Sequence, residues 1–259
     1  MDTMDKFSKV LYKNRQIWCR VVDNTCFELK NSIYDETVRC KETPLASKEL
    51  KLLPPCDASK VIALAYNYRG LVGKQDSYDE PLVFFKSLTG LIGHNDNVIY
   101  PAFANKVWQE VELAIIIKKT CKNVSVYDAE NYILGYTCGN DITSENILNR
   151  DWHLARSKGL DTFCPLGPHL VTGIDTSQLR LRSFINKRKT QDSFTSDRIL
   201  NDHEAVSLVS RYVTLSPGDV ILTGSPFGAT DAVIVPGDTI KIDIEKIGVL
   251  TNIIRKEAS

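Results

Sequence analysis

Glu110 and Glu112 are the first residues of the chain whose types and spacing suggest chemistry. In a β-strand, side chains two residues apart project from the same face, so both carboxylates would point to one side. The next residues, 113–117, are all apolar, which predicts a buried strand. Two like charges beside a buried segment are unfavourable unless a cation or a proton compensates them. The pair therefore indicates either a cation site or a strand that begins at the surface with both carboxylates solvated.

Asp141 is a third carboxylate in a suggestive position. It follows the strand-like run 134–140 and precedes residues 142–145, whose composition is typical of a helix start, so an ordinary N-cap is one interpretation. Three carboxylates that met in space would form an all-oxygen site, which suits Mg²⁺ or Mn²⁺ when water or substrate fills the open positions. The 29-residue spacing from Glu112 to Asp141 does not show that they meet.

Two further segments carry polar side chains next to rigid backbone. Lys158 leads into residues 159–168, where Pro165, Gly167 and Pro168 predict a fixed loop, although a lysine at such a place is usually solvated. Residues 222–226 predict a strand that ends in a turn, which presents the Thr223 hydroxyl and backbone N–H groups or is a simple turn. The four histidines lack H-x-x-H and H-E-x-x-H spacing, so we expect no histidine metal site.

The elements that must position these residues are mostly short strands. Pro54-Pro55 is the best candidate linker, because two prolines continue neither a helix nor a central strand. We therefore expect a small N-terminal lobe over residues 1–57 and a catalytic domain over residues 58–259. Strands are predicted at 16–22, 61–66, 81–85, 111–117, 220–222 and 239–245, and helices at 127–134 and 203–213. Together, these predicted strands and helices indicate a mixed, β-rich (α+β) fold with short peripheral helices.

Composition excludes several classes of protein. The 259 residues can bury a core without disulfides or a structural metal. The 32 basic residues balance 32 acidic ones, which argues against a nucleic-acid partner. We expect no membrane association, because no apolar run approaches about 18 residues and no secretory leader opens the chain. Seven cysteines without a C-x-x-C pair predict reduced thiols in a cytoplasmic protein.

Taken in order, the motifs resemble those of the fumarylacetoacetate hydrolase family. The resemblance covers about residues 58–255, and seven ordered blocks carry it: 66–68, 80–86, 110–113, 135–141, 161–168, 195–197 and 215–226. It implies a β-roll core that holds one Mg²⁺ or Mn²⁺, usually in a homodimer. It also implies a small-molecule substrate, a 2-oxo acid or acylpyruvate, that undergoes C–C hydrolysis, decarboxylation or tautomerisation.

The resemblance also assigns roles to single residues. Glu110 and Glu112 match the metal ligands of an E-x-E motif, and Asp141 matches the third carboxylate. Lys158 matches an active-site lysine and is the predicted catalytic residue. The predicted substrate-binding residues are Thr223, at a strand end, and Lys86, in the pocket lining.

Two departures from the family pattern bear on the reaction. Leu71 and Lys74 occupy the places of a histidine and a glutamate that activate water on a lid, and residues 143–146 replace a Ser-Ala-Arg-Asp run. Hydrolysis needs such a base, whereas forming a metal-stabilised enolate does not. Lys158 is the remaining acid/base, provided that its pKa is lowered.

We therefore expect tautomerisation or decarboxylation of an oxaloacetate-like 2-oxo diacid. The alternatives are a C–C hydrolase of acylpyruvates or fumarylacetoacetate-type diketo acids, and a metal-binding family member without catalysis.

Overall fold

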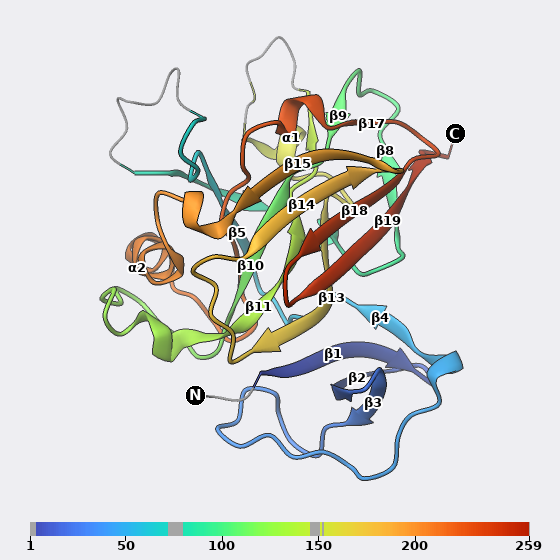
Figure 1. The fold of residues 1–259 in the computed structure, drawn as a ribbon, viewed down its shortest axis with the longest axis vertical. Coiled ribbons are helices and arrows are strands. Elements are labelled where there is room, and N and C mark those ends of the chain that lie inside the picture. The colour runs from blue at the N-terminus through green and yellow to red at the C-terminus, as the bar shows by residue number, and fades with distance from the viewer. Residues whose placement is uncertain (1–3, 72–79, 146–150, 152, 259) are drawn as a thin grey trace.

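A computed structural model describes residues 4–71, 80–145, 151 and 153–258 of the chain. Within this part the fold is β-rich with a few short helices, as predicted (Figure 1). The largest sheet has the strand order β3-β2-β1-β13-β11-β10-β16-β5-β6, with β4 paired to β1 and β7 paired to β13. Its strands are β1 (Asp5–Tyr12), β2 (Arg15–Val22), β3 (Thr25–Glu28), β4 (Lys51–Leu53), β5 (Val61–Ala65), β6 (Leu82–Lys86), β7 (Leu91–Ile92), β10 (Val111–Ile117), β11 (Ile133–Asn140), β13 (Cys164–Thr172) and β16 (Val220–Leu222).

Two smaller sheets complete the fold. A five-stranded sheet contains β15 (Arg188–Phe194), β14 (Arg180–Ile185), β18 (Thr239–Ile244), β19 (Gly248–Lys256) and β8 (Asn97–Tyr100), in that order. A three-stranded sheet joins β12 (Thr143–Ser144), β9 (Val107–Trp108) and β17 (Val233–Ile234). Residues 239–244 alternate between buried and more exposed positions, so the predicted half-buried strand is β18.

Strand β10 lies in the middle of the core. Leu113 and Ile115 belong to one buried cluster, together with side chains of the five-stranded sheet such as Ile242. Ala114 and Ile116 point the other way into a second cluster. Because both faces of the strand are covered, a continuous apolar run is favourable here, and the two glutamates at its start are held at the edge of a buried region.

The helices are short. Helix α2 (Asp202–Tyr212) agrees with the predicted helix, and the side chain of Asn201 caps it by accepting a hydrogen bond from Glu204 N. Helix α1 (Ala155–Lys158) ends at the predicted catalytic lysine. Five 3₁₀ turns are described: η1 (Ser47–Glu49), η2 (Leu88–Gly90), η3 (Ala129–Tyr132), η5 (Thr195–Asp197) and η6 (Ala229–Asp231).

Two local predictions were wrong. The helix expected at 127–134 is only the 3₁₀ turn η3, because β11 begins at Ile133 and its backbone pairs with β10. The helix start expected after Asp141 is strand β12 instead. There Thr143 and Ser144 pair with β9, and the Glu145 N–H, which a helix would direct to Asp141 O, donates to Lys106 O instead.

The N-terminal residues join the main sheet through strand pairing. Strand β1 pairs antiparallel with β13, and β2 and β3 continue the sheet outward (Figure 1). The division at residue 57 stays a prediction. All seven cysteines are free thiols. Among the described residues, no helix is both long and apolar enough to cross a membrane.

Asp219 fixes the start of the parallel pair β5–β16 and gives a prediction about acid stability. Its buried carboxylate accepts hydrogen bonds from the backbone of Ser59, Lys60 and Ser216 and pairs with Lys60 Nζ. Burial alone would raise the pKa of Asp219, but these donors outweigh it and hold the pKa below 3.8.

A carboxyl with a lowered pKa stabilises the fold above its unfolded pKa, and this stabilisation is lost as the pH falls through the folded value. We expect Asp219→Asn to cost about 2–3 kcal/mol of unfolding free energy at pH 7. The difference from wild type should shrink below pH 3.8, as measured by urea unfolding at several pH values. A difference that is constant down to pH 2 would contradict this account.

Candidate metal centre and active site

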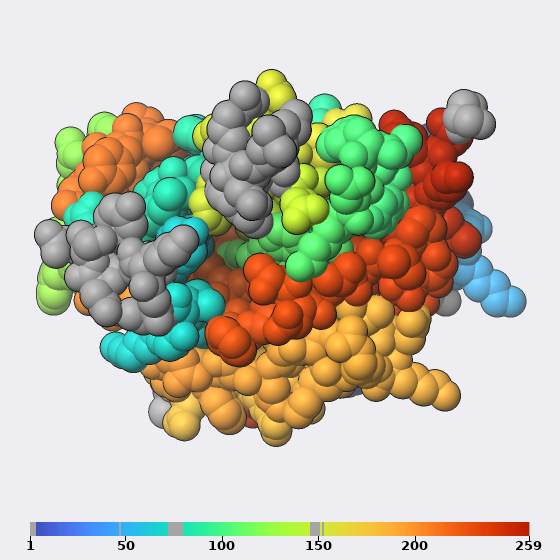
Figure 2. Space-filling view, turned by 90° about the horizontal axis from the view of Figure 1, so that it is seen from above, coloured from blue at the N-terminus to red at the C-terminus, as the bar shows by residue number. Residues whose placement is uncertain are grey.

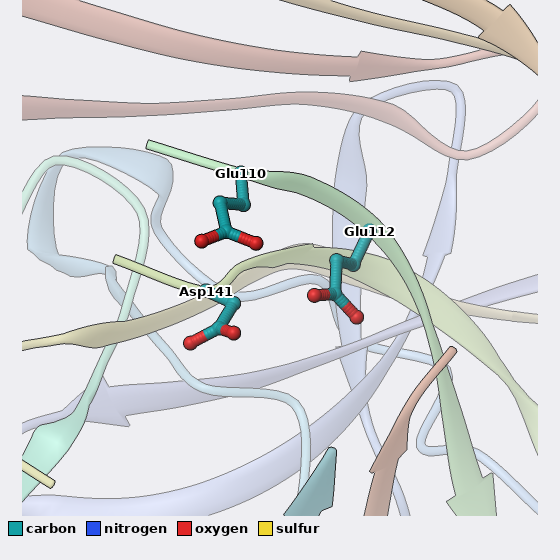
Figure 3. A group of neighbouring side chains, drawn as sticks. All are labelled: Glu110, Glu112 and Asp141. Carbon is teal, nitrogen blue, oxygen red and sulfur yellow. The ribbon is translucent and has the colours of Figure 1, made fainter. Parts of the chain in front are cut away.

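The three predicted carboxylates converge. Glu110 directly precedes β10, Glu112 lies in it, and Asp141 directly follows β11. Strands β10 and β11 are antiparallel neighbours with Glu112 opposite Gly139, so the start of one strand meets the end of the other. The ligand oxygens of the three residues all lie within 4.8 Å of one another (Figure 3).

The contacts of the two glutamates leave oxygens for a cation. Glu110 Oε1 accepts hydrogen bonds from Trp108 Nε1 at 2.9 Å, Thr143 Oγ1 at 2.6 Å and Lys158 Nζ at 2.9 Å. Glu112 Oε2 accepts one from Gly224 N at 2.6 Å. Within the part of the chain that the structure describes, Glu110 Oε2 and Glu112 Oε1 have no hydrogen-bond donor.

The electrostatics of the cluster also favour a cation. Burial raises the pKa of Glu112 well above 4.5, and the charges of Asp141 and Glu110 raise it further. Three carboxylates face two lysines, Lys86 and Lys158, so one negative charge remains uncompensated when all five groups are ionised. A buried all-oxygen donor set with residual negative charge fits a hard divalent cation such as Mg²⁺ or Mn²⁺.

Asp141 lies between the two lysines. Lys86 Nζ is 2.6 Å from Asp141 Oδ1 and Lys158 Nζ is 2.5 Å from Oδ2, and all three side chains are buried. Burial alone would raise the pKa of Asp141, but Lys158 and Lys86 outweigh it and lower the pKa. Lys86 also donates to Ile142 O at 2.9 Å. Its ammonium therefore orients Asp141, and its predicted contact with substrate stays a prediction.

Lys158 is a charged partner of the carboxylates in this structure. Burial alone would lower its pKa, but the charges of Asp141 and Glu110 outweigh burial and raise it. An acid/base role near neutral pH would need the opposite direction, a lowered pKa. The contacts thus make Lys158 a fixed positive charge beside the site. Its predicted catalytic role stays a prediction.

Thr223 lies at the same end of the sheet, after β16. Its hydroxyl donates to Leu113 O at 2.9 Å, and this bond attaches the strand end to β10. The next residue, Gly224, has φ +94°, and a Cβ there would lie 3.0 Å from Asn67 Cβ. This close approach lets the Gly224 N–H reach Glu112. Thr223 therefore positions the turn, and its contact with substrate stays a prediction.

Sequence reasoning missed several residues of the site. Trp108 is two residues before Glu110, and the same strand spacing that joined the glutamates could have found it. Tyr66 and His153 contact each other beside the cluster, and nothing in their spacing predicts this. Leu71, which replaces the lid histidine, is half-buried. Lys74 lies outside the described residues.

The fold agrees with comparisons to known proteins. Residues 60–255 match the family model "Fumarylacetoacetate (FAA) hydrolase C-terminal". Protein Rv2993c of Mycobacterium tuberculosis is 41% identical over 219 residues, 82% of this chain and 81% of that protein. The mitochondrial oxaloacetate tautomerase FAHD2A of Bos taurus is 34% identical over 218 residues, 78% of this chain and 68% of that protein.

A solved structure extends the match to nearly the whole chain. The 5-carboxymethyl-2-hydroxymuconate delta-isomerase of Mycobacterium smegmatis superposes with a TM-score of 0.89 at 36% identity and covers 97% of this chain and 100% of its own. The chain belongs to the fumarylacetoacetate hydrolase family, whose members are hydrolases, isomerases and tautomerases. The resemblance and the prediction of an enzyme are confirmed.

Proposed function

We propose that the protein is a Mg²⁺- or Mn²⁺-dependent enzyme that tautomerises or decarboxylates a small, oxaloacetate-like 2-oxo diacid through an enolate. The observation that carries the proposal is the convergence of Glu110, Glu112 and Asp141, with two oxygens that lack donors among the described residues. These three residues would hold the cation. When bound, the cation supplies Lewis-acid stabilisation of negative charge on the substrate oxygens.

The chain's own residues shape the rest of the site. Lys158 and Lys86 offset two of the three carboxylate charges, so a divalent cation held there would make the net charge of the site +1, which favours an anionic substrate. The Gly224 N–H holds Glu112 in place, so the carboxylate is oriented before any ligand arrives. Such preorganised charges stabilise a developing enolate without rearrangement.

Two observations favour isomerisation over hydrolysis. Leu71, at the place of the family's lid histidine, has an apolar side chain that cannot activate water. Two isomerase structures, from Mycobacterium smegmatis and Mycobacterium marinum, are 36% and 34% identical to the chain. Two hydrolase structures, from Exiguobacterium antarcticum and a Sphingobium strain, are each 25% identical. Hydrolysis of acylpyruvates is the alternative, and a non-catalytic metal-binding protein is the second one.

Parallel assays with Mg²⁺ test the reaction type. Loss of enol absorbance measures ketonisation of oxaloacetate, release of pyruvate measures its decarboxylation, and release of acetate measures hydrolysis of acetylpyruvate. We expect kcat/KM for hydrolysis to be about 10²–10⁴-fold below that for the faster of the other two reactions, because a general base contributes about that factor.

Faster hydrolysis than either other reaction would favour the hydrolase alternative. No turnover in any assay, with tight Mn²⁺ binding, would favour the non-catalytic alternative. The predicted homodimer and the cytoplasmic location remain parts of the proposal.

A further inference from the structure

His153 and Tyr66 form a polar pair next to the carboxylate cluster. His153 Nε2 lies 3.2 Å from Tyr66 Oη, and the two rings meet edge to face at 5.3 Å between centroids. Phe84 connects the pair to the cluster, because its ring centroid is 5.2 Å from that of His153 and 5.3 Å from Lys158 Nζ. Figure 2, which views the molecule from above, shows a hollow between the teal, green and red-orange segments.

The backbone of both residues is held in an unusual conformation. Tyr66 has φ 68° and His153 has φ 60°, in the left-handed region that large side chains seldom adopt. Asn67 fixes the first of these, since its amide donates to Thr223 O and Leu200 O and accepts from Leu200 N. Such strain persists when surrounding contacts impose it, and it is concentrated at functional sites.

The imidazole of His153 has one ring nitrogen without a protein partner in the described part of the chain. Its Nδ1 is buried and has no hydrogen-bond partner among the described residues. Burial, the largest cause, and the charge of Lys158 together lower the pKa of His153 to about 4, against the opposing charge of Asp141. The ring is therefore neutral near pH 7, with one nitrogen protonated and the other holding a lone pair. A buried ring nitrogen without a partner is costly unless a ligand supplies one.

We propose that His153 is the acid/base that moves the proton between the enol oxygen and the adjacent carbon, with Tyr66 as its positioning residue. This inference rests on the proposed function and names the proton carrier of that site. It also accounts for a site in which the lid histidine is replaced by Leu71 and Lys158 is a fixed charge.

The proton transfer balances within the substrate and one ring. The neutral imidazole takes the proton of the enol O–H, and the electron pair of that bond stays on oxygen. The C=O bond then forms as the C=C electron pair takes the proton from the imidazolium to make the new C–H bond. The ring returns to its neutral form, and no other reactant is needed. Because the enol oxygen and the carbon are separated by one atom, a single nitrogen can serve both.

Ketonisation kinetics of His153→Gln test the proposal. We expect kcat for oxaloacetate ketonisation to fall about 10²–10⁴-fold with Mn²⁺ affinity unchanged, and Tyr66→Phe to give a smaller loss. The matched control is His203→Gln, on helix α2, which should retain wild-type kcat. A His153→Gln enzyme within twofold of wild type, with normal folding by circular dichroism, would overturn the proposal.

A second measurement does not depend on turnover. In protein with ¹⁵N-labelled imidazoles, the His153 signal, assigned with His153→Gln, should shift when Mg²⁺ and oxalate are added together, and the His203 signal should not. If wild type ketonises no substrate and the His153 signal still shifts, the proposed function fails while the placement of His153 at the ligand stands. If oxalate binds by calorimetry and the His153 signal does not shift, the inference is overturned.

Discussion

Replacing Glu112 with Gln is expected to remove Mn²⁺ binding and activity together while the protein stays folded. Glu112 Oε1 is one of the two carboxylate oxygens that have no hydrogen-bond donor among the described residues. The amide of Gln is a much weaker ligand for a hard cation than a carboxylate is. Changes in outer-shell partners of a metal cost about 10–100-fold in affinity or activity, so loss of a direct ligand should cost at least about 100-fold. Calorimetric titration with Mn²⁺ and the ketonisation assay measure both effects.

The same substitution should leave the cation-free protein equally stable or more stable. Burial and the neighbouring carboxylates disfavour the charged form of Glu112, and the amide oxygen of Gln can still accept the Gly224 N–H. Because the folded pKa is raised, wild type should lose stability as the pH rises above 4.5, and the variant should lose less. The control is the exposed Glu130→Gln, which should change neither property. Wild-type Mn²⁺ affinity in Glu112→Gln would contradict the assigned ligand set.

Replacing Lys158 with Met is expected to destabilise the cation-free protein strongly. Lys158 pairs with Asp141 and Glu110 in a buried setting, and removing one partner of a buried ion pair costs about 3–5 kcal/mol. The cluster then has a single lysine, Lys86, against three carboxylates. Thermal unfolding should therefore show a larger stabilisation by Mg²⁺ in the variant than in wild type, because the cation replaces the lost charge.

Lys60→Met is the matched control for this substitution. It also removes a lysine from a buried carboxylate, but Asp219 keeps its backbone donors and lies away from the cluster. Its unfolding should not respond to Mg²⁺ more than wild type does. Equal Mg²⁺ stabilisation of Lys158→Met and wild type would show that Lys158 does not compete with a cation for these carboxylates.

Several features of the site follow from local sequence. The apolar run after Glu112 predicted a strand buried on both faces, and β10 packs into two clusters as that run requires. The E-x-E spacing placed two carboxylates on one face, because side chains alternate along any strand. The ordered blocks predicted the family and its fold. The strand and the carboxylate pair depend on residues a few positions apart, so periodicity predicts them, whereas the family follows from the order of the motif blocks along the chain.

Tertiary structure decided what depends on distant residues. The antiparallel pairing of β10 with β11 brings Asp141 to the glutamates. The register of this pairing cannot be predicted from the spacing of the residues along the chain. The same Asp141 begins no helix, because the residues that follow it pair with strand β9 and the Glu145 N–H donates to Lys106 O.

The ionisation of the site was also set by the fold. The direction of the pKa shift of Lys158 was not predictable from its sequence position. Burial lowers this pKa, and the carboxylates 2.5–2.9 Å away raise it. The distances between the groups decide which of the two effects is larger. His153 belongs to no H-x-x-H or H-E-x-x-H motif, and its contacts with Tyr66 and Phe84 join segments about 70–90 residues apart. The sequence by itself determined which groups could do chemistry. The fold determined which of these groups meet and in what charge state, because Coulomb and desolvation energies depend on three-dimensional distance and burial.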